Sequence, residues 1–369
     1  MSGLSIHLLN VGRGDCILLR FPDKSWAVVD CGERSYPYEP HNQAAIFLKE
    51  EQPYDTPVRF ILATHPDSDH DGGIMQLLQL INRDVRAVYY SGVERRRMMH
   101  CGTLEEDVEE YSFVKEAQRR LARREILEFK ALQRGDRINF NDPPLPNVSI
   151  KVLWPIRKFV DLARGCHDLG RQHQLRNNVS VVLEIKYAGC SIILPGDIQG
   201  EYVNRDVFGS LQGSLLNVIK APHHGGVSSI IPWDIIGNSD GEKFVLISCP
   251  SYSEKHPHRK FLSSIPMGDK RWKIRCTGIA SACADRQEPV TWPLPAEDRS
   301  FLPVSLLRYE SMRRSFLAIG KRGRIVRLHV HHECCLNNQI TISEVGKIKH
   351  TMDVSACDSR INNTYLCDD

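Results

Sequence analysis

The chain has 369 residues, of which 41% are hydrophobic and 25% charged, as is typical of a soluble globular protein. Its 48 basic and 45 acidic residues leave a formal net charge of +3, so overall charge gives no argument for a nucleic-acid partner. There is no apolar run near the roughly 20 residues that span a bilayer, and the first residues do not resemble a signal peptide. Because the twelve cysteines are scattered without a secretory context, we expect a reduced, cytoplasmic protein that does not bind membranes.

Strands and helices alternate in the first half of the chain. Short apolar runs separated by turn residues predict a β-meander. After it come apolar residues at helical spacing and then a run of β-branched and other apolar residues that ends directly before His65. The expected strands are Ser5–Asn10, Cys16–Phe21, Trp26–Val29, Val58–Thr64 and Ala87–Tyr90, and the expected helices are Gln43–Lys49 and Ile74–Ile81. Glu, Arg, Leu and Ala dominate Thr103–Leu132, which predicts a long charged helix, an insertion or a docking surface for a protein partner.

The second half repeats this style of alternation without repeating the sequence. Its expected strands are Val148–Leu153, Val179–Tyr187, Ser191–Leu194, Leu215–Lys220 and Phe244–Ser248, with a helix near Val203–Leu211. Beyond about Pro295 the pattern of residue types changes. A small β-rich extension is indicated by Val326–Val330 and Asn337–Glu344. We therefore expect one main domain over residues 1–295 and a C-terminal extension over residues 296–369.

A dense group of potential metal ligands follows the strand that ends at Thr64. The group consists of His65, Asp67, Asp69 and His70. Imidazole and carboxylate groups suit zinc, manganese or iron, and two ions that share a bridging carboxylate can activate water. The alternative is an Asx-rich turn that caps a helix. Because Asp197 follows another apolar run and His223 and His224 a third, we expect three ligand-bearing loops at one sheet edge.

Several blocks in a fixed order are similar to the metallo-β-lactamase superfamily and, within it, to the metallohydrolase domain of the DNA-uptake competence protein ComEC. The blocks are LNVGRGD at 9–15, VDCG at 29–32, the HxDxDH pattern at 65–70, NVSVVL at 178–183, PGD at 195–197, KAPHHG at 220–225 and SYSEKHP at 251–257. The similarity covers roughly residues 4–280. It implies an α/β fold, a four-layer αββα sandwich with a dinuclear metal site at one edge of its two sheets.

The resemblance also implies a ligand set. By position, His65 and Asp67 would bind one ion, Asp69, His70 and His223 would bind the other, and Asp197 would bridge them. His224 would be an outer ligand or a phosphate contact. Asp67 stands where most members have histidine, and Asn177, Asn178 and Ser180 stand where most have a further histidine. Oxygen atoms are harder ligands than imidazole nitrogen and favour harder metal ions such as Mn²⁺. We therefore expect two divalent ions, either Mn²⁺ or Zn²⁺.

Hydrolysis is the reaction expected of such a centre. Two cations lower the pKa of a water molecule and neutralise charge on the attacked group. We expect Asp69 or Asp197 to accept a hydrogen bond from the nucleophilic water and His256 to give a proton to the leaving oxygen. The alternative for His256 is a structural role in the loop before Pro257. The remaining candidates for substrate contact or support of the site are Asn178, Ser180, Tyr252 and Asp15, the last of which also fits a turn.

The resemblance implies phosphodiester substrates, with single-stranded DNA or another nucleotide polymer first. Basic residues are compatible with phosphate binding, although arginines in loops usually form a solvated surface. They are Arg157, Lys158, Arg164, Arg171 and Arg176, expected in the loop before Asn177, and a second cluster at Arg95–Arg97. Two alternatives stay open: hydrolysis of carboxylic esters, thioesters or lactams on the same fold, and a partner-regulated effector or sensor subunit of a multi-protein system.

Histidines and cysteines also gather in the C-terminal extension. They are His329, His331, His332, Cys334 and Cys335. Clustered imidazoles and thiols can bind zinc. Because adjacent cysteines lack CxxC spacing and Leu328–His332 alternates as in a half-exposed strand, we interpret this segment as a strand.

Overall fold

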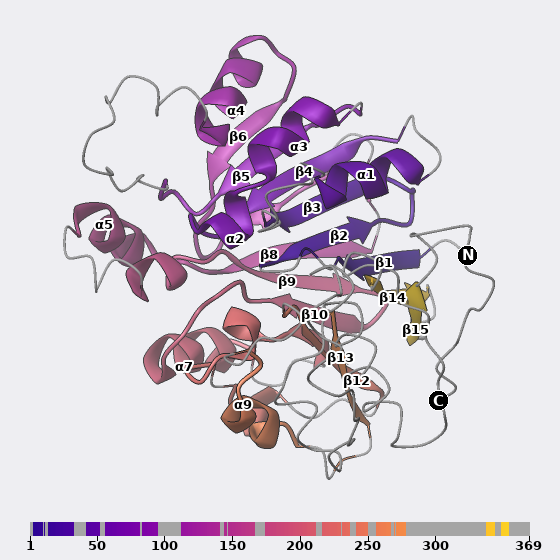
Figure 1. The fold of residues 1–369 in the computed structure, drawn as a ribbon, viewed down its shortest axis with the longest axis vertical. Helices are drawn as coiled ribbons and strands as arrows, with labels where there is room; N and C mark the ends of the chain where they lie inside the picture. Colours follow the sequence, from indigo (N-terminus) through magenta and orange to yellow (C-terminus); the bar gives the residue numbers. More distant parts are fainter. Residues whose placement is uncertain are drawn as a thin grey trace, which may run out of the picture.

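The computed structural model is described here for most of the first 277 residues and for two later strands (Figure 1). The described ranges are 3–9, 11, 14–32, 42–51, 56–81, 83–94, 112–140, 144–145, 147–166, 174–211, 216–229, 231–236, 241–249, 256–266, 269, 271–277, 337–343 and 348–353.

Two mixed β-sheets form the centre of the molecule. The first consists of β1 (Gly3–Leu8), β2 (Cys16–Arg20), β3 (Trp26–Cys31), β4 (Val58–Ala63), β5 (Ala87–Tyr90), β6 (Glu128–Ala131), β14 (Asn337–Ser343) and β15 (Ile348–Asp353), in the spatial order β15-β14-β1-β2-β3-β4-β5-β6. The second consists of β7 (Arg137–Ile138), β8 (Val148–Trp154), β9 (Val182–Tyr187), β10 (Cys190–Leu194), β11 (Leu216–Lys220), β12 (Lys243–Ile247) and β13 (Trp272–Cys276), in the order β13-β12-β11-β10-β9-β8-β7.

Helices cover the outer faces of both sheets. The helical elements are α1 (Gln43–Glu50), α2 (Ser68–Asp71), α3 (Ile74–Leu80), α4 (Phe113–Ala122), α5 (Arg157–Gly165), α7 (Glu201–Gly209), the 3-10 turn η2 (Pro222–Gly225), α8 (Trp233–Ile236) and α9 (Arg259–Ser264). Helices α1, α3 and α4 lie over the first sheet, and α7 and α9 lie on the side of the second (Figure 1). The resulting order of layers is αββα, as the sequence predicted.

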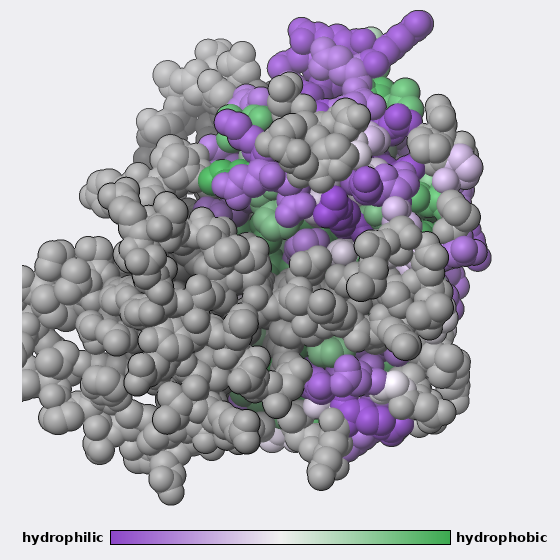
Figure 2. All heavy atoms as spheres, turned by 90° about the vertical axis from the view of Figure 1, so that its right-hand side faces the viewer, coloured by the Kyte–Doolittle hydropathy of each residue, from purple (hydrophilic) through white to green (hydrophobic). Residues whose placement is uncertain are grey.

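Three buried apolar clusters correspond to the spaces between these layers. The largest lies between the sheets and takes residues such as Leu19, Phe60 and Leu183 from alternate positions of both. A second joins the outer face of the first sheet to α1, α3 and α4, and a third joins the outer face of the second sheet to α7 and α9. Each central strand is therefore buried on both faces, which is why β4 and β10 are mostly apolar, with one buried polar residue each, Arg59 and Ser191. On the face in Figure 2, the described surface residues are mainly hydrophilic.

The strand positions explain why the candidate ligands meet. Strand β4 pairs in parallel with β3 and β5, and β11 pairs in parallel with β10 and β12. Parallel strands deliver the loops that follow them to the same edge of a sheet. The loops after β4, β10 and β11 are the ones that carry the predicted ligands.

The prediction of one long charged helix over Thr103–Leu132 is wrong for the residues described. Helix α4 has ten residues, and its buried residues, Phe113, Val114 and Ala117, pack on the first sheet. It ends at Arg123, after which Arg124 adopts a positive φ of 60°. The chain then forms β6, which pairs in parallel with β5. Residues 103–111 lie outside the described part of the chain, so the docking surface proposed for the helix stays a prediction.

A second correction concerns the basic residues expected in a loop before Asn177. Arg157, Lys158 and Arg164 belong to α5, a nine-residue helix, rather than to a loop. Arg164 is held by a hydrogen bond from its Nε to the carbonyl oxygen of Gly92 at 2.7 Å. Arg171 and Arg95–Arg97 lie outside the described residues.

Two strands of the C-terminal extension add to the edge of the first sheet. Strand β14 pairs antiparallel with β1, and β15 pairs antiparallel with β14. Val326–Val330 lies outside the described residues, as does the predicted cluster of His329, His331, His332, Cys334 and Cys335, and the domain boundary stays a prediction. Among the helices described, none has the length and apolar character of a membrane span.

Candidate metal centre

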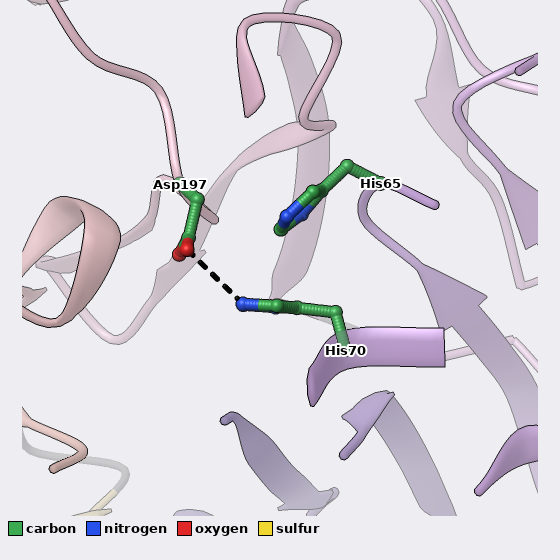
Figure 3. Close-up of side chains that lie close together, drawn as sticks. All are labelled: His65, His70 and Asp197. Carbon is green, nitrogen blue, oxygen red and sulfur yellow. Dashed lines mark ion pairs between the residues drawn. The ribbon is translucent and has the colours of Figure 1, made fainter. Parts of the chain in front are cut away.

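Side chains from both sheets converge where β4 and β10 end. His65 follows β4, His70 lies on the short helix α2, and Asp197 follows β10. Figure 3 shows the two imidazole rings and the carboxylate turned toward one another. The ring centroids of His65 and His70 are 4.1 Å apart, and His70 Nε2 lies 3.2 Å from Asp197 Oδ2. All three side chains are buried, and the loops after β4 and β10 lie next to each other at this point.

A second group of ligand atoms shares His70 with the first and lies next to Asp197. His224 Nε2 lies 3.4 Å from Asp197 Oδ2 and 3.8 Å from Asp69 Oδ2. Among the described residues, the ligand atoms of His65, His70 and Asp197 lie within 4.8 Å of one another, as do those of Asp69, His70 and His224. Two clusters that overlap in this way can hold two neighbouring cations with a shared ligand.

The buried imidazoles of the centre fit a bound cation. In the described part of the chain, Nε2 of His65, His70 and His224 is buried without a hydrogen-bond partner. A buried polar atom without a partner is costly, and a metal ion is one way to satisfy three such nitrogens that face the same carboxylates. The donor set of imidazole and carboxylate groups suits Zn²⁺ or Mn²⁺.

The Nδ1 atoms of two of these histidines are engaged behind the centre. His70 Nδ1 donates to Asp30 Oδ2 at 2.8 Å, while Asp30 also accepts hydrogen bonds from Thr64 N and Thr64 Oγ1 at 2.7 Å each. Carboxylates in this position orient a ligating imidazole and increase its basicity. The structure adds this contact with His70, which sequence reasoning missed.

Asp15 supports the other histidine. Its Oδ1 lies 3.4 Å from His224 Nδ1, which is also 3.1 Å from the carbonyl oxygen of Ser248. The backbone N–H of Asp15 donates to the carbonyl oxygen of Asp69 at 2.9 Å. Its neighbour Gly14 has a φ of 102°, and a Cβ there would lie 1.8 Å from that same oxygen, so glycine allows the close approach. The supporting position predicted for Asp15 agrees with these contacts.

Lys220 is a buried residue of the centre that sequence reasoning missed. Its side chain is fully buried, and Nζ lies 2.5 Å from Asp15 Oδ2 and 3.2 Å from Asp197 Oδ1. It also donates to the carbonyl oxygen of Gly196 at 3.3 Å. A buried lysine is rare unless it is paired. The sequence signal was its position at the end of an apolar strand, directly before the loop that carries His224.

The charges of the centre shift the pKa values of its members. Burial alone would raise the pKa of Asp197, but His70, His224 and Lys220 hold it well below its usual range. Burial alone would lower the pKa of His70, but the carboxylates of Asp197 and Asp30 raise it well above 6.5. Burial lowers the pKa of His65 well below 6.5, and the neighbouring charge of His70 adds to this.

The two adjacent histidines of η2 point to different surroundings. His223 and His224 have positive φ values of 45° and 53°, which make a tight turn. His224 reaches the ligand clusters, whereas the ring of His223 lies 5.3 Å from that of His256. The sequence gave His223 the ligand position and His224 the outer one. Among the clusters formed by described residues, it is His224 that occurs.

His256 lies beside this turn. Burial and the neighbouring charges of His224 and His223 lower the pKa of His256 to about 4. Its imidazole is therefore neutral near pH 7. Tyr252, predicted from the same block, lies outside the described residues.

Two of the predicted polar residues hold the loop that carries Asp197. Ser180 Oγ accepts a hydrogen bond from Asp197 N at 3.0 Å and donates to the carbonyl oxygen of Asn177 at 2.6 Å. Asn178 Oδ1 accepts from Gln199 N at 2.8 Å. These bonds fix the loop around Asp197 and give both residues a supporting position.

Asp67 lies at the edge of the centre. It is the N-cap residue of α2, but its side chain makes no capping hydrogen bond. Instead, Oδ2 lies 3.8 Å from His65 Nε2, and Oδ1 lies 3.3 Å from Nε of Arg176. A simple helix cap therefore does not explain this aspartate.

A comparison with known protein families shows the superfamily to which the chain belongs. The family model of the metallo-β-lactamase superfamily matches residues 9–225, and the chain belongs to this superfamily of metallohydrolases. Its fold implies bound divalent metal ions, for which the clusters above supply ligands.

Similar solved structures come from bacteria and an archaeon. One is a metallo hydrolase, Igni18, from Ignicoccus hospitalis, with 13% identity, a TM-score of 0.41, and coverage of 74% of this chain and 94% of that chain. Another is the metallo-β-lactamase fold protein YhfI from Bacillus subtilis, with 11% identity, a TM-score of 0.39, and coverage of 74% and 95%. A search of the curated proteins gives no match.

Proposed function

We propose that this protein is a metal-dependent phosphodiesterase that cleaves DNA or another nucleotide substrate. The observation that carries the proposal is the pair of ligand clusters that share His70, with Asp197 Oδ2 lying beside both His70 and His224. The ordered blocks shared with the ComEC metallohydrolase domain support a phosphodiester substrate. We take Mn²⁺ or Zn²⁺ as the ions, with His65, Asp67 and Asp197 around one and Asp69, His70, His224 and Asp197 around the other.

The bound ions would lower the pKa of a water molecule and offset the charge of the phosphate. Two aspartates of the centre have different surroundings and therefore different roles in this proposal. Asp197 is held through Oδ1 by Lys220, which leaves Oδ2 facing His70 and His224. Asp69 is more accessible, with 37% of its side chain exposed, so it is placed to accept a hydrogen bond from the attacking water.

We take His256 as the candidate for contact with the leaving group. Since burial and the neighbouring histidines keep its pKa at about 4, it is neutral at pH 7. A neutral imidazole still carries one N–H group, which can donate a hydrogen bond to the leaving oxygen as negative charge develops there. In this proposal His256 stabilises the leaving group as a hydrogen-bond donor.

Cleavage of labelled single- and double-stranded DNA and RNA tests this function. The purified protein is assayed with Mn²⁺, Zn²⁺, Mg²⁺ or a chelator, beside Asp69→Ala and the control Asp136→Asn, which removes a carboxylate that binds Gln133 N on another loop. We expect metal-dependent cleavage that Asp69→Ala reduces by at least ~100-fold and that the control leaves unchanged. Cleavage that persists in the chelator or in Asp69→Ala would refute the proposal, as would activity confined to ester, thioester or β-lactam substrates.

A further inference from the structure

Arg176 lies beside the candidate ligand Asp67, within a helical turn over residues 174–177. We propose that Arg176 binds an anionic oxygen of the substrate and selects phosphodiesters over neutral esters. The inference rests on the proposed function, since it names the substrate group that this part of the same centre recognises.

The guanidinium group of Arg176 lies close to Asp67 but does not form a hydrogen bond with it through Nε. Nε lies 3.3 Å from Asp67 Oδ1, yet this pair does not meet hydrogen-bond geometry, and Nε makes no hydrogen bond within the described residues. The side chain of Arg176 is 25% exposed and that of Asp67 is 14% exposed. Lys220, by contrast, is fully buried between two carboxylates. Of the two cations, Arg176 and Lys220, Arg176 is therefore the one that an incoming substrate can reach.

The backbone that carries Arg176 is held firmly to the second sheet. The carbonyl oxygen of Arg176 accepts a hydrogen bond from Val179 N at 3.3 Å. Two residues further on, the carbonyl oxygen of Asn178 accepts one from the indole Nε1 of Trp154 at 2.6 Å, and Trp154 is fully buried. The arginine side chain thus starts from a fixed point next to the centre, which lowers the entropy lost when it binds a ligand.

Metal binding would change what Arg176 faces. When Asp67 ligates a divalent cation, its negative charge is shared with that cation, and the guanidinium group then lies close to a second positive charge. An anionic oxygen placed between them would be attracted by both. Arginine also matches the geometry of phosphate oxygens, to which it can donate two parallel hydrogen bonds. A neutral carboxylic ester offers no such charge, so it would gain much less from Arg176.

Equilibrium binding of thymidine 5′-monophosphate to the Mn²⁺-loaded protein tests the proposal without relying on turnover. The wild type is compared by calorimetry with Arg176→Ala, Arg176→Lys and Arg119→Ala. Arg119 is a matched control because it is an arginine of α4 with one exposed carboxylate contact, to Glu116 at 2.8 Å. We expect Arg176→Ala to weaken binding by about 10–100-fold and Arg176→Lys to weaken it less, with Arg119→Ala unchanged.

Two further readouts separate substrate contact from support of Asp67. Manganese content should be equal in all four proteins, and Arg176→Ala should raise KM for bis(p-nitrophenyl) phosphate while leaving hydrolysis of p-nitrophenyl acetate at the wild-type level. Nucleotide binding that is unchanged in Arg176→Ala, or absent in the wild type, would overturn the proposal. Loss of manganese from Arg176→Ala would also overturn it and make Arg176 a positioning residue. If the nucleotide binds through Arg176 but no diester is cleaved, the proposed function fails while the anion site stands.

Discussion

His65 and His70 are neighbours in the centre, but their surroundings differ. Both are buried, and their ring centroids are 4.1 Å apart. His65 Nδ1 lies 3.2 Å from a hydroxyl group, Thr64 Oγ1, and burial lowers its pKa. His70 lies between the carboxylates of Asp30 and Asp197, which raise its pKa despite its burial. Two residues of one type in one loop are therefore prepared differently for a metal ion.

The difference sets how each histidine would receive a cation. A metal ion binds the neutral imidazole. Burial favours the neutral form of His65, whereas the carboxylates beside His70 favour its protonated form, with which a metal ion would compete. One of these carboxylates, Asp197, is also paired with the buried ammonium group of Lys220, which contacts Asp15 as well. His70 is thus surrounded by a network of buried charges. His65 instead lies near Asp67, which is close to Arg176.

The largest effect is expected from removing the buried cation of the His70 side. Lys220→Met leaves Asp15 and Asp197 without their shared partner, so we expect the metal-free protein to lose ~3–5 kcal/mol of unfolding free energy. Urea denaturation in the presence of a chelator measures this. Lys186→Met, which removes an exposed lysine paired with Glu184, should cost less than about 1 kcal/mol. Equal losses in the two variants would show that no such charge network exists.

Removing the carboxylate behind His70 should have a smaller effect. Asp30→Asn keeps the shape of the side chain but weakens the acceptor of the His70 Nδ1–H bond. We expect metal affinity to fall by about 10–100-fold, because partners behind a ligating histidine contribute on this scale. Competition with a chromophoric chelator gives the affinity, with Asp136→Asn as the control. Wild-type affinity in Asp30→Asn would remove the distinction between the two histidines.

The smallest expected effect is a change in pH dependence at His256. In the metal-free protein its pKa of about 4 lies below the usual 6.5, so between these values the unfolded chain binds a proton that the folded one does not. His256 therefore reduces stability as pH falls from 6.5 toward 4 and has no effect above that range. Denaturation of wild type and His256→Gln at pH 5 and pH 7.5 should show a smaller loss at pH 5 in the variant. The same loss in both proteins would contradict the prediction.

Much of the fold could be predicted because the central strands are apolar runs with clear ends. The runs that end near Thr64 and Leu194 coincide with β4 and β10, and helix spacing placed α1 and α3 correctly. Prediction failed where composition was used without packing. Beyond Ala122, the residues predicted as helix turn at Arg124 and form β6, whose partner is β5. Pairing with a distant strand outweighed the helical preference of Glu and Ala.

The candidate site was predictable to the level of its loops. Local sequence placed His65 and His70 shortly after one apolar strand and Asp197 after another, because each follows a visible apolar run. Lys220 and Asp15 are far apart in the sequence, and the residues around each of them do not indicate that the two side chains are in contact. Whether His223 or His224 faces the centre depends on the positive φ values of one turn, which the residue types do not reveal.

Metal content tests the central claim most directly. Wild type and Asp197→Asn are stripped with a chelator, reloaded with Mn²⁺ or Zn²⁺, dialysed and analysed by mass spectrometry for bound metal. We predict about two ions per chain for the wild type and at most about one for Asp197→Asn, since Asp197 faces His70 and His224 and is the proposed shared ligand. A wild-type protein that retains neither metal, or an Asp197→Asn variant that retains as much as wild type, would contradict the proposed dinuclear centre.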